Sequence, residues 1–401
     1  MVPSRGGRMI RVAWQVPNSP EWVGGLNYFI NLANAIFAVP DRGIEPVLLG
    51  GTKGLPEPLC SCTGLAYPGI PVGRWNPWRI MDGLHRRWFD SGGALARHLK
   101  QHNIGLLSHG QILGRRSPVP AMCWIPDFQH VHLPSFFTEN DIAQRNKTHA
   151  DIAARAQAVV LSSEDARQDF LARYPIAADK TYVLRFVATM PEFQSMPELS
   201  DVLERYGIHE PYFHIPNQLW AHKNHNVVVE ALKILLSRGR CPLVVSTGQT
   251  NDYRNTTFFT KLKEQVDAYG LEDRFRFLGL TPFADMSMLM RGALAMINPS
   301  LFEGWSTTVE EAKSFGKRLL LSNIGVHREQ NPERGLFFDP HSPEELAEAM
   351  MSVVDGYNSE DERVHAEKAR NQLQGRIVAF GKVYQDIVLK VTQAQIGKLM
   401  K

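Results

Sequence analysis

Cysteine is scarce in this sequence. Only four of its 401 residues are cysteine, Cys60, Cys62, Cys123 and Cys241, and no two have the C-x-x-C spacing of a zinc site. Four cysteines in a chain of this length are also far too few for a disulfide framework. We therefore expect a protein of the reducing cytoplasm.

Long apolar runs are absent as well. Nowhere do 18 apolar residues follow one another, which is about the minimum for a helix that crosses a membrane. Residues 1–8 are polar and lack the apolar core of a signal peptide. We expect a protein that is neither exported nor membrane-spanning.

Charge of one sign is not concentrated anywhere. The 44 basic and 41 acidic residues leave a net charge of +3, without a run of five or six like charges, which is too weak a bias to favour a nucleic-acid partner. With 44% hydrophobic residues, the composition is that of an ordinary globular protein. The chain length predicts two domains.

Strand-like apolar runs alternate with helical patterns along the chain. A strand is predicted at 9–14 and a helix at 26–38, and this alternation is typical of α/β layers with a parallel sheet. Further strands are expected at 46–49, 104–108, 121–125, 158–162 and 181–184. They suffice for one six-stranded, doubly wound sheet.

The pattern lapses between residues 188 and 211 and then starts again. New strands are expected at 212–215, 242–247, 274–278, 294–298, 318–322 and 335–338. We therefore predict a second doubly wound domain, with domains at 1–195 and 196–375 and a C-terminal helix at 376–401.

The strongest motif is the segment 298–312, NPSLFEGWSTTVEEA. Thr307 and Glu310 have the spacing of a capping box, so a helix should begin at the Ser306–Thr307 turn. The backbone N–H groups and the positive dipole end of such a helix bind phosphate. Glu303 before this helix and Glu311 inside it would flank the phosphate, one accepting hydrogen bonds from sugar hydroxyls and the other from a ribose.

Two glutamates eight residues apart also fit a surface loop and a capped helix with solvated carboxylates. However, the run Glu303-Gly304-Trp305, five residues and then Glu311-Ala312 resembles the E-x7-E signature of retaining glycosyltransferases of family 4. The resemblance extends to 322–325, Glu329 and 335–340, where family members close the donor site and the sheet.

The resemblance implies a GT-B architecture, in which two Rossmann-like, doubly wound domains face each other across a cleft. A sugar nucleotide would bind mainly to the C-terminal domain and the acceptor to the N-terminal domain. The last helix, around 375–394, would cross back to the N-terminal domain. Transfer would retain the anomeric configuration.

A second family element is the segment 217–225, NQLWAHKNH, between a strand and a helix. It resembles the G-R-L-x-x-x-K segment whose cations hold the donor diphosphate, and it also fits a plain polar loop. Lys223 falls on the lysine, whereas Gln218 falls where the arginine usually stands. Glutamine donates a hydrogen bond without charge, and some members share this Asn-Gln version.

In the N-terminal half, Gly24 and Gly25 open a helix after the first strand. Glycines let a backbone approach a ligand closely, although such a pair is commonly a structural turn. The resemblance makes them neighbours of the donor diphosphate.

The segment 123–134 follows a predicted strand, where α/β sheets present ligand-binding groups. Family members carry His or Asp there, near the transferred sugar, so Asp127 and His130 are the catalytic candidates and His109 is a third. Their spacing fits no standard metal site, and the chain has no Asp-x-Asp motif. We expect neither a metal ion nor another cofactor.

Residues 74–88 hold three tryptophans and four arginines, with Asn76 as a predicted cap and Pro77 at the first helical position. Such a helix either packs its tryptophans on the sheet or rests an amphipathic face on lipid headgroups. Many members of the family glycosylate lipid-linked acceptors at the cytoplasmic membrane surface.

The resemblance therefore implies a hexosyltransferase that moves a sugar from a nucleotide diphosphate sugar to a glycan or lipid-linked acceptor in cell-surface polysaccharide synthesis. The leaving diphosphate would be stabilised by Lys223 and by the start of the predicted helix at Ser306, Thr307 and Thr308. Two alternatives stay open. A GT-B epimerase would need no acceptor, and a non-catalytic partner subunit would be expected to lose Glu303 or Lys223, which are both present.

Overall fold

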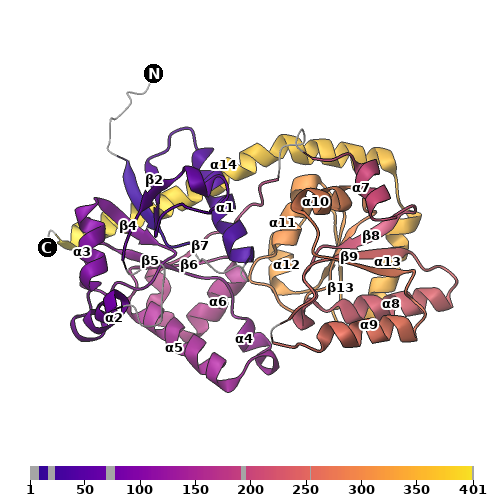
Figure 1. Cartoon of the computed structure of the whole chain (residues 1–401), viewed down its shortest axis with the longest axis horizontal. Helices are drawn as coiled ribbons and strands as arrows, with labels where there is room; N and C mark the ends of the chain where they lie inside the picture. The colour runs from indigo at the N-terminus through magenta and orange to yellow at the C-terminus, as the bar shows by residue number, and fades with distance from the viewer. Residues whose placement is uncertain (1–8, 17–22, 69–76, 191–195, 253, 400–401) are drawn as a thin grey trace. The chain divides into compact units, whose positions relative to one another are not determined.

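The computed structural model describes residues 9–16, 23–68, 77–190, 196–252 and 254–399 (Figure 1). The chain forms two compact units. The first comprises Met1–Phe128, Glu139–Val187 and Gly375–Lys401, and the second comprises Gln129–Thr138 and Ala188–Gln374.

The first unit is built on a parallel sheet of seven strands in the order β3-β2-β1-β4-β5-β6-β7. The strands are β1 (Ile10–Trp14), β2 (Ile44–Leu49), β3 (Thr63–Leu65), β4 (Ile104–Ser108), β5 (Ala121–Ile125), β6 (Ala158–Leu161) and β7 (Thr181–Val183). Its helical segments are α1 (Val23–Phe37), η1 (Leu59–Ser61), α2 (Pro77–Phe89), α3 (Gly93–Gln101), α5 (Glu139–Arg155), α6 (Glu164–Arg173) and η3 (Pro175–Lys180). The central strands are almost wholly buried, as expected of a parallel sheet covered on both faces.

The second unit has a six-stranded parallel sheet in the order β10-β9-β8-β11-β12-β13. Its strands are β8 (Tyr212–Ile215), β9 (Leu243–Thr247), β10 (Phe275–Gly279), β11 (Met296–Asn298), β12 (Leu319–Ser322) and β13 (Gly335–Phe338). Its helical segments are α4 (Gln129–His132), η2 (Pro134–Phe136), α7 (Leu199–Arg205), η5 (Ala221–Lys223), α8 (His225–Ser237), α9 (Phe258–Ala268), α10 (Phe283–Gly292), α11 (Thr307–Phe315), α12 (Gly325–Gln330) and α13 (Pro343–Asp355).

The side chains of β12 show how this second sheet is covered. Leu320 joins the core cluster that α8 and α13 build on one face of the sheet. Leu319 and Leu321 join the cluster on the other face, which α11 builds with Val309 and Phe315. Because successive strand residues point to opposite faces, an unbroken apolar run such as LLL fits a strand between two helical layers.

The predicted fold class is confirmed: both units are doubly wound, Rossmann-like α/β layers. The first sheet has seven strands instead of six, because the short strand β3 was not predicted. The six predicted strands of the second sheet are all present. The last helix, α14 (Ser359–Leu399), is continuous, and its part from Gly375 onwards belongs to the first unit. Of the residues described, no helix is both long and apolar enough to cross a membrane.

Candidate functional site

Helix α11 begins at Thr307, as predicted, but a different residue caps it. Ser306 is the N-cap, and its hydroxyl accepts a hydrogen bond from the Val309 amide at 3.4 Å. The predicted capping box of Thr307 and Glu310 is wrong, because the Glu310 carboxylate instead accepts from Lys313 at 3.0 Å. The Asn298 amide donates to the Ser306 hydroxyl at 2.8 Å and fixes the cap.

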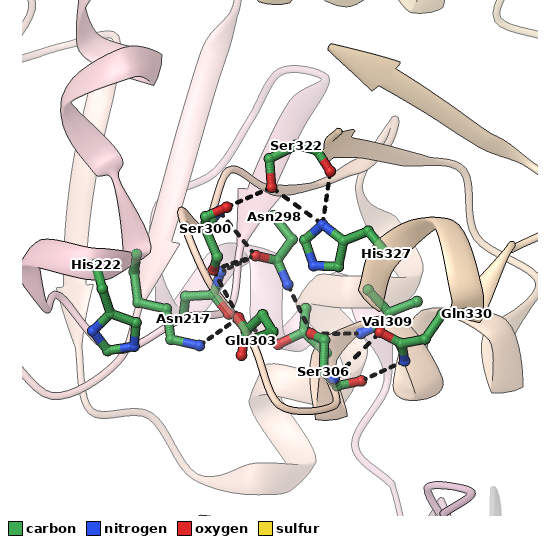
Figure 2. Close-up of polar contacts among 12 residues, drawn as sticks. Asn217, His222, Asn298, Ser300, Glu303, Ser306, Val309, Ser322, His327 and Gln330 are labelled. Carbon is green, nitrogen blue, oxygen red and sulfur yellow. Dashed lines mark hydrogen bonds and ion pairs between the residues drawn. The ribbon is translucent and has the colours of Figure 1, made fainter. Parts of the chain in front are cut away.

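A buried network of short polar side chains ties this helix start to the loop after β8 (Figure 2). Asn298, at the end of β11, accepts from Asn217 at 3.2 Å and from the Ser300 hydroxyl at 2.7 Å. The hydroxyl of Thr308 donates to the Asn217 side chain at 2.9 Å. Two loops from neighbouring strands therefore hold each other at the carboxyl edge of the sheet.

Lys223 and Glu303 form an ion pair in this site. The Lys223 ammonium lies 2.6 Å from Glu303 Oε1, and the two side chains are only 17% and 10% exposed. The Ser300 hydroxyl donates to the same carboxylate oxygen at 2.7 Å. Burial alone would raise the pKa of Glu303, but the nearby Lys223 ammonium and the hydrogen bonds from Lys223 and Ser300 hold it below its ordinary value. Glu303 is therefore ionised at neutral pH.

The loop that carries Lys223 is fixed from both ends. Asn224 has a left-handed backbone with φ of 56°, and its side-chain amide donates to the carbonyls of Pro299 and Pro340 at 3.1 and 2.8 Å. The Leu301 amide donates to the His222 carbonyl at 2.9 Å. The lysine loop and the glutamate loop thus share backbone contacts as well as the ion pair.

Gln218 lies in the same loop, half-buried, directly after Asn217. Gly248, after β9, packs against this turn with φ of +144°, and a Cβ there would lie 2.4 Å from the Asn217 carbonyl oxygen. Only glycine allows the two backbones to approach this closely. The position of Gln218 is thereby set by backbone packing.

His327 lies behind the ion pair on α12. Its Nδ1 atom is 2.9 Å from the Ser322 carbonyl oxygen and 3.1 Å from the Ser322 hydroxyl. Burial lowers the pKa of this imidazole to about 4, although Glu303 opposes the shift. His327 is therefore neutral at physiological pH and adds no positive charge to the site.

Glu311 differs sharply from Glu303. Its side chain lies in the second turn of α11 with 6% exposure, and it makes no hydrogen bond or ion pair with the residues that the structure describes. Burial raises the pKa of this carboxyl to about 8. At neutral pH one glutamate of the pair is ionised and the other is protonated.

The catalytic candidates after β5 fall in different units. Asp127 belongs to the first unit and lies 3.9 Å from the Arg145 guanidinium. His130 belongs to the second unit, where its ring is buried and meets Phe137 edge-on at a centroid distance of 6.3 Å. Gly24 and Gly25 lie in the first turn of α1.

His109 is the centre of a polar chain in the first unit. It has a left-handed backbone with φ of 57°, and its ring nitrogens lie 2.7 Å from the Ser108 hydroxyl and 2.8 Å from the Tyr28 hydroxyl. Tyr384 of α14 donates to Ser108 at 2.8 Å and accepts from Trp14 at 2.7 Å. Burial lowers the pKa of His109 to about 3, so its imidazole is neutral.

The sequence analysis assigned no role to Asn217, Asn298 and Ser300, although they lie in the two motif segments, and it did not single out His327 and Gln330. The signal that could have indicated them is their place in the sequence, at or just after the end of a predicted strand or shortly before the next one. No group of three or more His, Cys, Asp or Glu side chains among the residues described is arranged to hold a metal ion.

Residues 207–372 match the family described as glycosyl transferases group 1. The chain is similar to the O-antigen chain mannosyltransferase B of Escherichia coli, with 23% identity over 229 residues, which is 55% of this chain and 58% of that protein. The chain thus spans little more than half the length of this curated relative.

The fold is shared with solved structures. A glycosyltransferase from Rickettsia africae superposes with a TM-score of 0.67 at 16% identity, covering 97% of this chain and 99% of the other. HepE from Anabaena, solved in complex with UDP and glucose, superposes with a TM-score of 0.63 at 17% identity, covering 98% and 100% of the two chains. At these identities the likeness shows the fold alone.

The raised pKa of Glu311 predicts that this residue costs stability. An unfolded glutamate titrates near pH 4.3, whereas folded Glu311 keeps its proton up to about pH 8. Below about pH 4 Glu311 is protonated in both the folded and the unfolded state and costs the fold nothing. As the pH rises towards 8 the unfolded chain ionises while the folded protein does not, and the free energy of unfolding falls. Glu311→Gln cannot ionise, so it should melt roughly 5 °C or more above wild type at pH 8 and closer to it at pH 5.

Thermal melts of the ligand-free protein at the two pH values measure this difference. Glu348→Gln, at an exposed position of α13, is the control and should leave the melting temperature unchanged. A Glu311→Gln variant that melts below wild type at pH 8 would show that the carboxylate is stabilising.

Proposed function

We propose that this chain transfers a sugar from a nucleotide diphosphate sugar to a glycan or lipid-linked acceptor, because residues 207–372 match the glycosyl transferases group 1 family. The observation that carries this proposal is the buried Lys223–Glu303 pair beside the start of α11. The names of the similar proteins, an O-antigen mannosyltransferase among them, favour transfer over epimerisation and cell-surface polysaccharide synthesis as the setting.

The donor diphosphate has two partners in this proposal. The amino end of α11, at Ser306, Thr307 and Thr308, offers backbone N–H groups and a positive dipole end, and Lys223 offers an ammonium. During transfer the bond from the anomeric carbon to the diphosphate oxygen breaks, the acceptor oxygen bonds to that carbon, and the acceptor proton is released to solvent. Both partners stabilise the negative charge that the diphosphate gains. Gln218 would add an uncharged hydrogen bond.

In this proposal the two glutamates bind different parts of the donor, Glu303 the transferred sugar and Glu311 the ribose. Glu303 is ionised and held by Lys223 and Ser300, so it can accept hydrogen bonds from the hydroxyls of the transferred sugar. Glu311 is buried without a partner among the described residues, and two ribose hydroxyls would supply the donors that its carboxylate lacks. Ribose binding would then lower its pKa and release a proton.

The remaining roles are proposed on the resemblance. Asp127 and His130 would lie near the transferred sugar, Gly24 and Gly25 would neighbour the diphosphate, and transfer would retain the anomeric configuration. No metal ion or other cofactor takes part in this scheme, since the leaving diphosphate has a lysine and a helix end as partners.

We further propose that the protein works at the cytoplasmic face of a membrane, with α2 as its contact. Of the two alternatives for this helix, packing of the tryptophans on the sheet does not fit Trp78 and Trp88, which are 45% and 73% exposed. Trp78, Met81, Leu84 and Trp88 recur three or four residues apart, so they line one face of the helix. Arg74, Trp75 and Asn76 lie outside the described residues.

One side of α2 is anchored at Asp82, which lies four residues after Trp78 and therefore beside it on the helix surface. Asp82 is buried and accepts hydrogen bonds from the Tyr67 hydroxyl at 2.6 Å and from the Ala94 amide at 2.9 Å. This anchor fixes which side of the helix faces outward. The helix also contains three arginines in its sequence, so an apolar stripe on a basic helix fits an anionic lipid surface.

Kinetics should separate the two glutamates. Glu303→Ala is expected to lower turnover roughly 10² to 10³-fold, because it removes a positioned group at the reacting sugar. Glu311→Ala is expected chiefly to weaken nucleotide binding. Release of nucleoside diphosphate measures turnover, calorimetry measures binding, and Glu348→Ala is the control. Unchanged activity in both variants would contradict the assignment.

Transfer should persist in the presence of EDTA, because a lysine and a helix end serve the diphosphate in place of a divalent ion. The same release assay, run with and without the chelator, tests this. Complete loss of activity that Mg²⁺ or Mn²⁺ restores would show that a metal ion is required.

The stripe on α2 should govern lipid binding. Replacing Trp78 and Trp88 together by Ser should reduce sedimentation with anionic phospholipid vesicles about tenfold or more, since each loses an apolar group that enters the interface. Leu280→Ser, which removes an 83% exposed side chain of the second unit, is the control. Equal sedimentation of all three proteins would exclude α2 as the contact.

A further inference from the structure

The segment Gln129–Thr138, here called the strap, lies in the sequence between β5 and α5 of the first unit. It nevertheless belongs to the second unit. It consists of α4 and η2 joined by Leu133. Two of its contacts reach residues that directly precede Lys223 and Glu303.

The first contact runs through Arg254, in the loop after β9. Its guanidinium donates to the Gln129 side-chain oxygen at 2.8 Å and lies 5.3 Å from the centre of the Phe137 ring, so it binds both ends of the strap. The same guanidinium lies 5.3 Å from the Trp220 ring and 3.3 Å from His222 Nδ1. Arg254 therefore bridges the strap and the lysine loop.

Arg254 is held in place by Asp252. The guanidinium Nε lies 3.7 Å from Asp252 Oδ1, and the backbone amide of Arg254 donates to the same oxygen at 3.0 Å. The other carboxylate oxygen accepts from the Ala221 amide at 3.2 Å. With only 13% of its side chain exposed, Arg254 is a fixed part of the site.

The second contact is aromatic. The imidazole of His132 stacks on the Phe302 ring with a centroid distance of 5.0 Å and an angle of 25°. Phe302 directly precedes Glu303, as His222 directly precedes Lys223. The strap thus contacts both loops that meet at the ion pair.

We propose that the strap is part of the donor site and that Arg254 is the positioning residue that fastens it. This inference rests on the proposed function. Lys223 ends the short helical segment η5 and Glu303 lies in the loop after β11, and residues that act on a reacting centre need supporting contacts to hold them in place. The strap supplies such contacts to the residue before Lys223, through Arg254, and to the residue before Glu303, through His132.

The proposal has a reciprocal consequence. A donor that bridges Lys223 and the start of α11 restrains the lysine loop, and through Arg254 it restrains the strap. By linkage, if donor binding stabilises the bound position of the strap, then that position of the strap increases the affinity for the donor by the same factor. Hydrogen exchange of the strap amides should therefore respond to a nucleotide bound at Lys223 and the start of α11.

Hydrogen exchange followed by mass spectrometry on the full chain tests this, with UDP and GDP as probes. In wild type, the nucleoside diphosphate that binds should slow exchange of peptide 129–138 at least about threefold. In Arg254→Gln the peptide should exchange faster without nucleotide, and it should lose this response. Turnover should fall tenfold or more, with a smaller change in KM for the donor.

Matched variants separate positioning from general damage. Arg254→Lys keeps the charge and should recover part of the turnover, and His132→Ala removes the second contact without touching Arg254. Arg274→Gln breaks an exposed ion pair with Glu210 elsewhere in the unit and should behave as wild type. If Arg254→Gln fails to fold, His132→Ala carries the test.

Three outcomes are decisive. A strap that exchanges equally with and without bound nucleotide would overturn the proposal, as would a folded Arg254→Gln with wild-type turnover. A wild type that binds neither UDP nor GDP would count against the proposed function and against the donor-site role of the strap. In that case unchanged exchange in Arg254→Gln would refute the fastening contact as well.

Discussion

The ion pair of Lys223 and Glu303 is the interaction on which the rest of the site depends. Its two residues are 80 positions apart in the sequence and meet at 2.6 Å with little exposure. Removing two charges from water is costly, and a buried pair persists only where further hydrogen bonds satisfy it. The Ser300 hydroxyl provides such a bond to Glu303, and Asn298 in turn holds Ser300.

The two glutamates of the motif show how the surroundings of a carboxyl group decide its protonation state. Glu303 lies in the loop before α11, and Glu311 lies within α11. Glu303 faces an ammonium and a hydroxyl, which lower its pKa, whereas Glu311 has only burial, which raises its pKa to about 8. A buried carboxyl without a partner lowers the stability of the ligand-free protein. A loss of stability of this kind is typical of a side chain whose role is to bind a ligand.

The sequence indicated the fold and the start of α11 because both depend on local patterns. Apolar runs of strand length and a Ser-Thr-Thr turn before a helical stretch are readable without tertiary information. The cap itself was assigned to the wrong residue, because Asn298 and Gln330, which hold Ser306, come from other elements. The three-residue strand β3 has two exposed residues and gave no apolar signal.

The membership of the strap in the second unit was beyond sequence reasoning, since it rests on contacts of Gln129, His132 and Phe137 with residues more than 100 positions away. The tryptophans of α2 were ambiguous for a related reason. An amphipathic pattern predicts that a helix has two faces, but only the buried Asp82 shows which face is turned inward.

The measurement that tests the central claim most directly is titration calorimetry of the wild type and of Lys223→Met with UDP, GDP, ADP and dTDP. We predict that the wild type binds at least one of them with one site per chain. Lys223→Met should weaken that binding at least about tenfold, which corresponds to the loss of roughly 1.4 kcal/mol from one charge-assisted contact. Equal binding by both proteins, or no binding by the wild type, would contradict a diphosphate site at the start of α11.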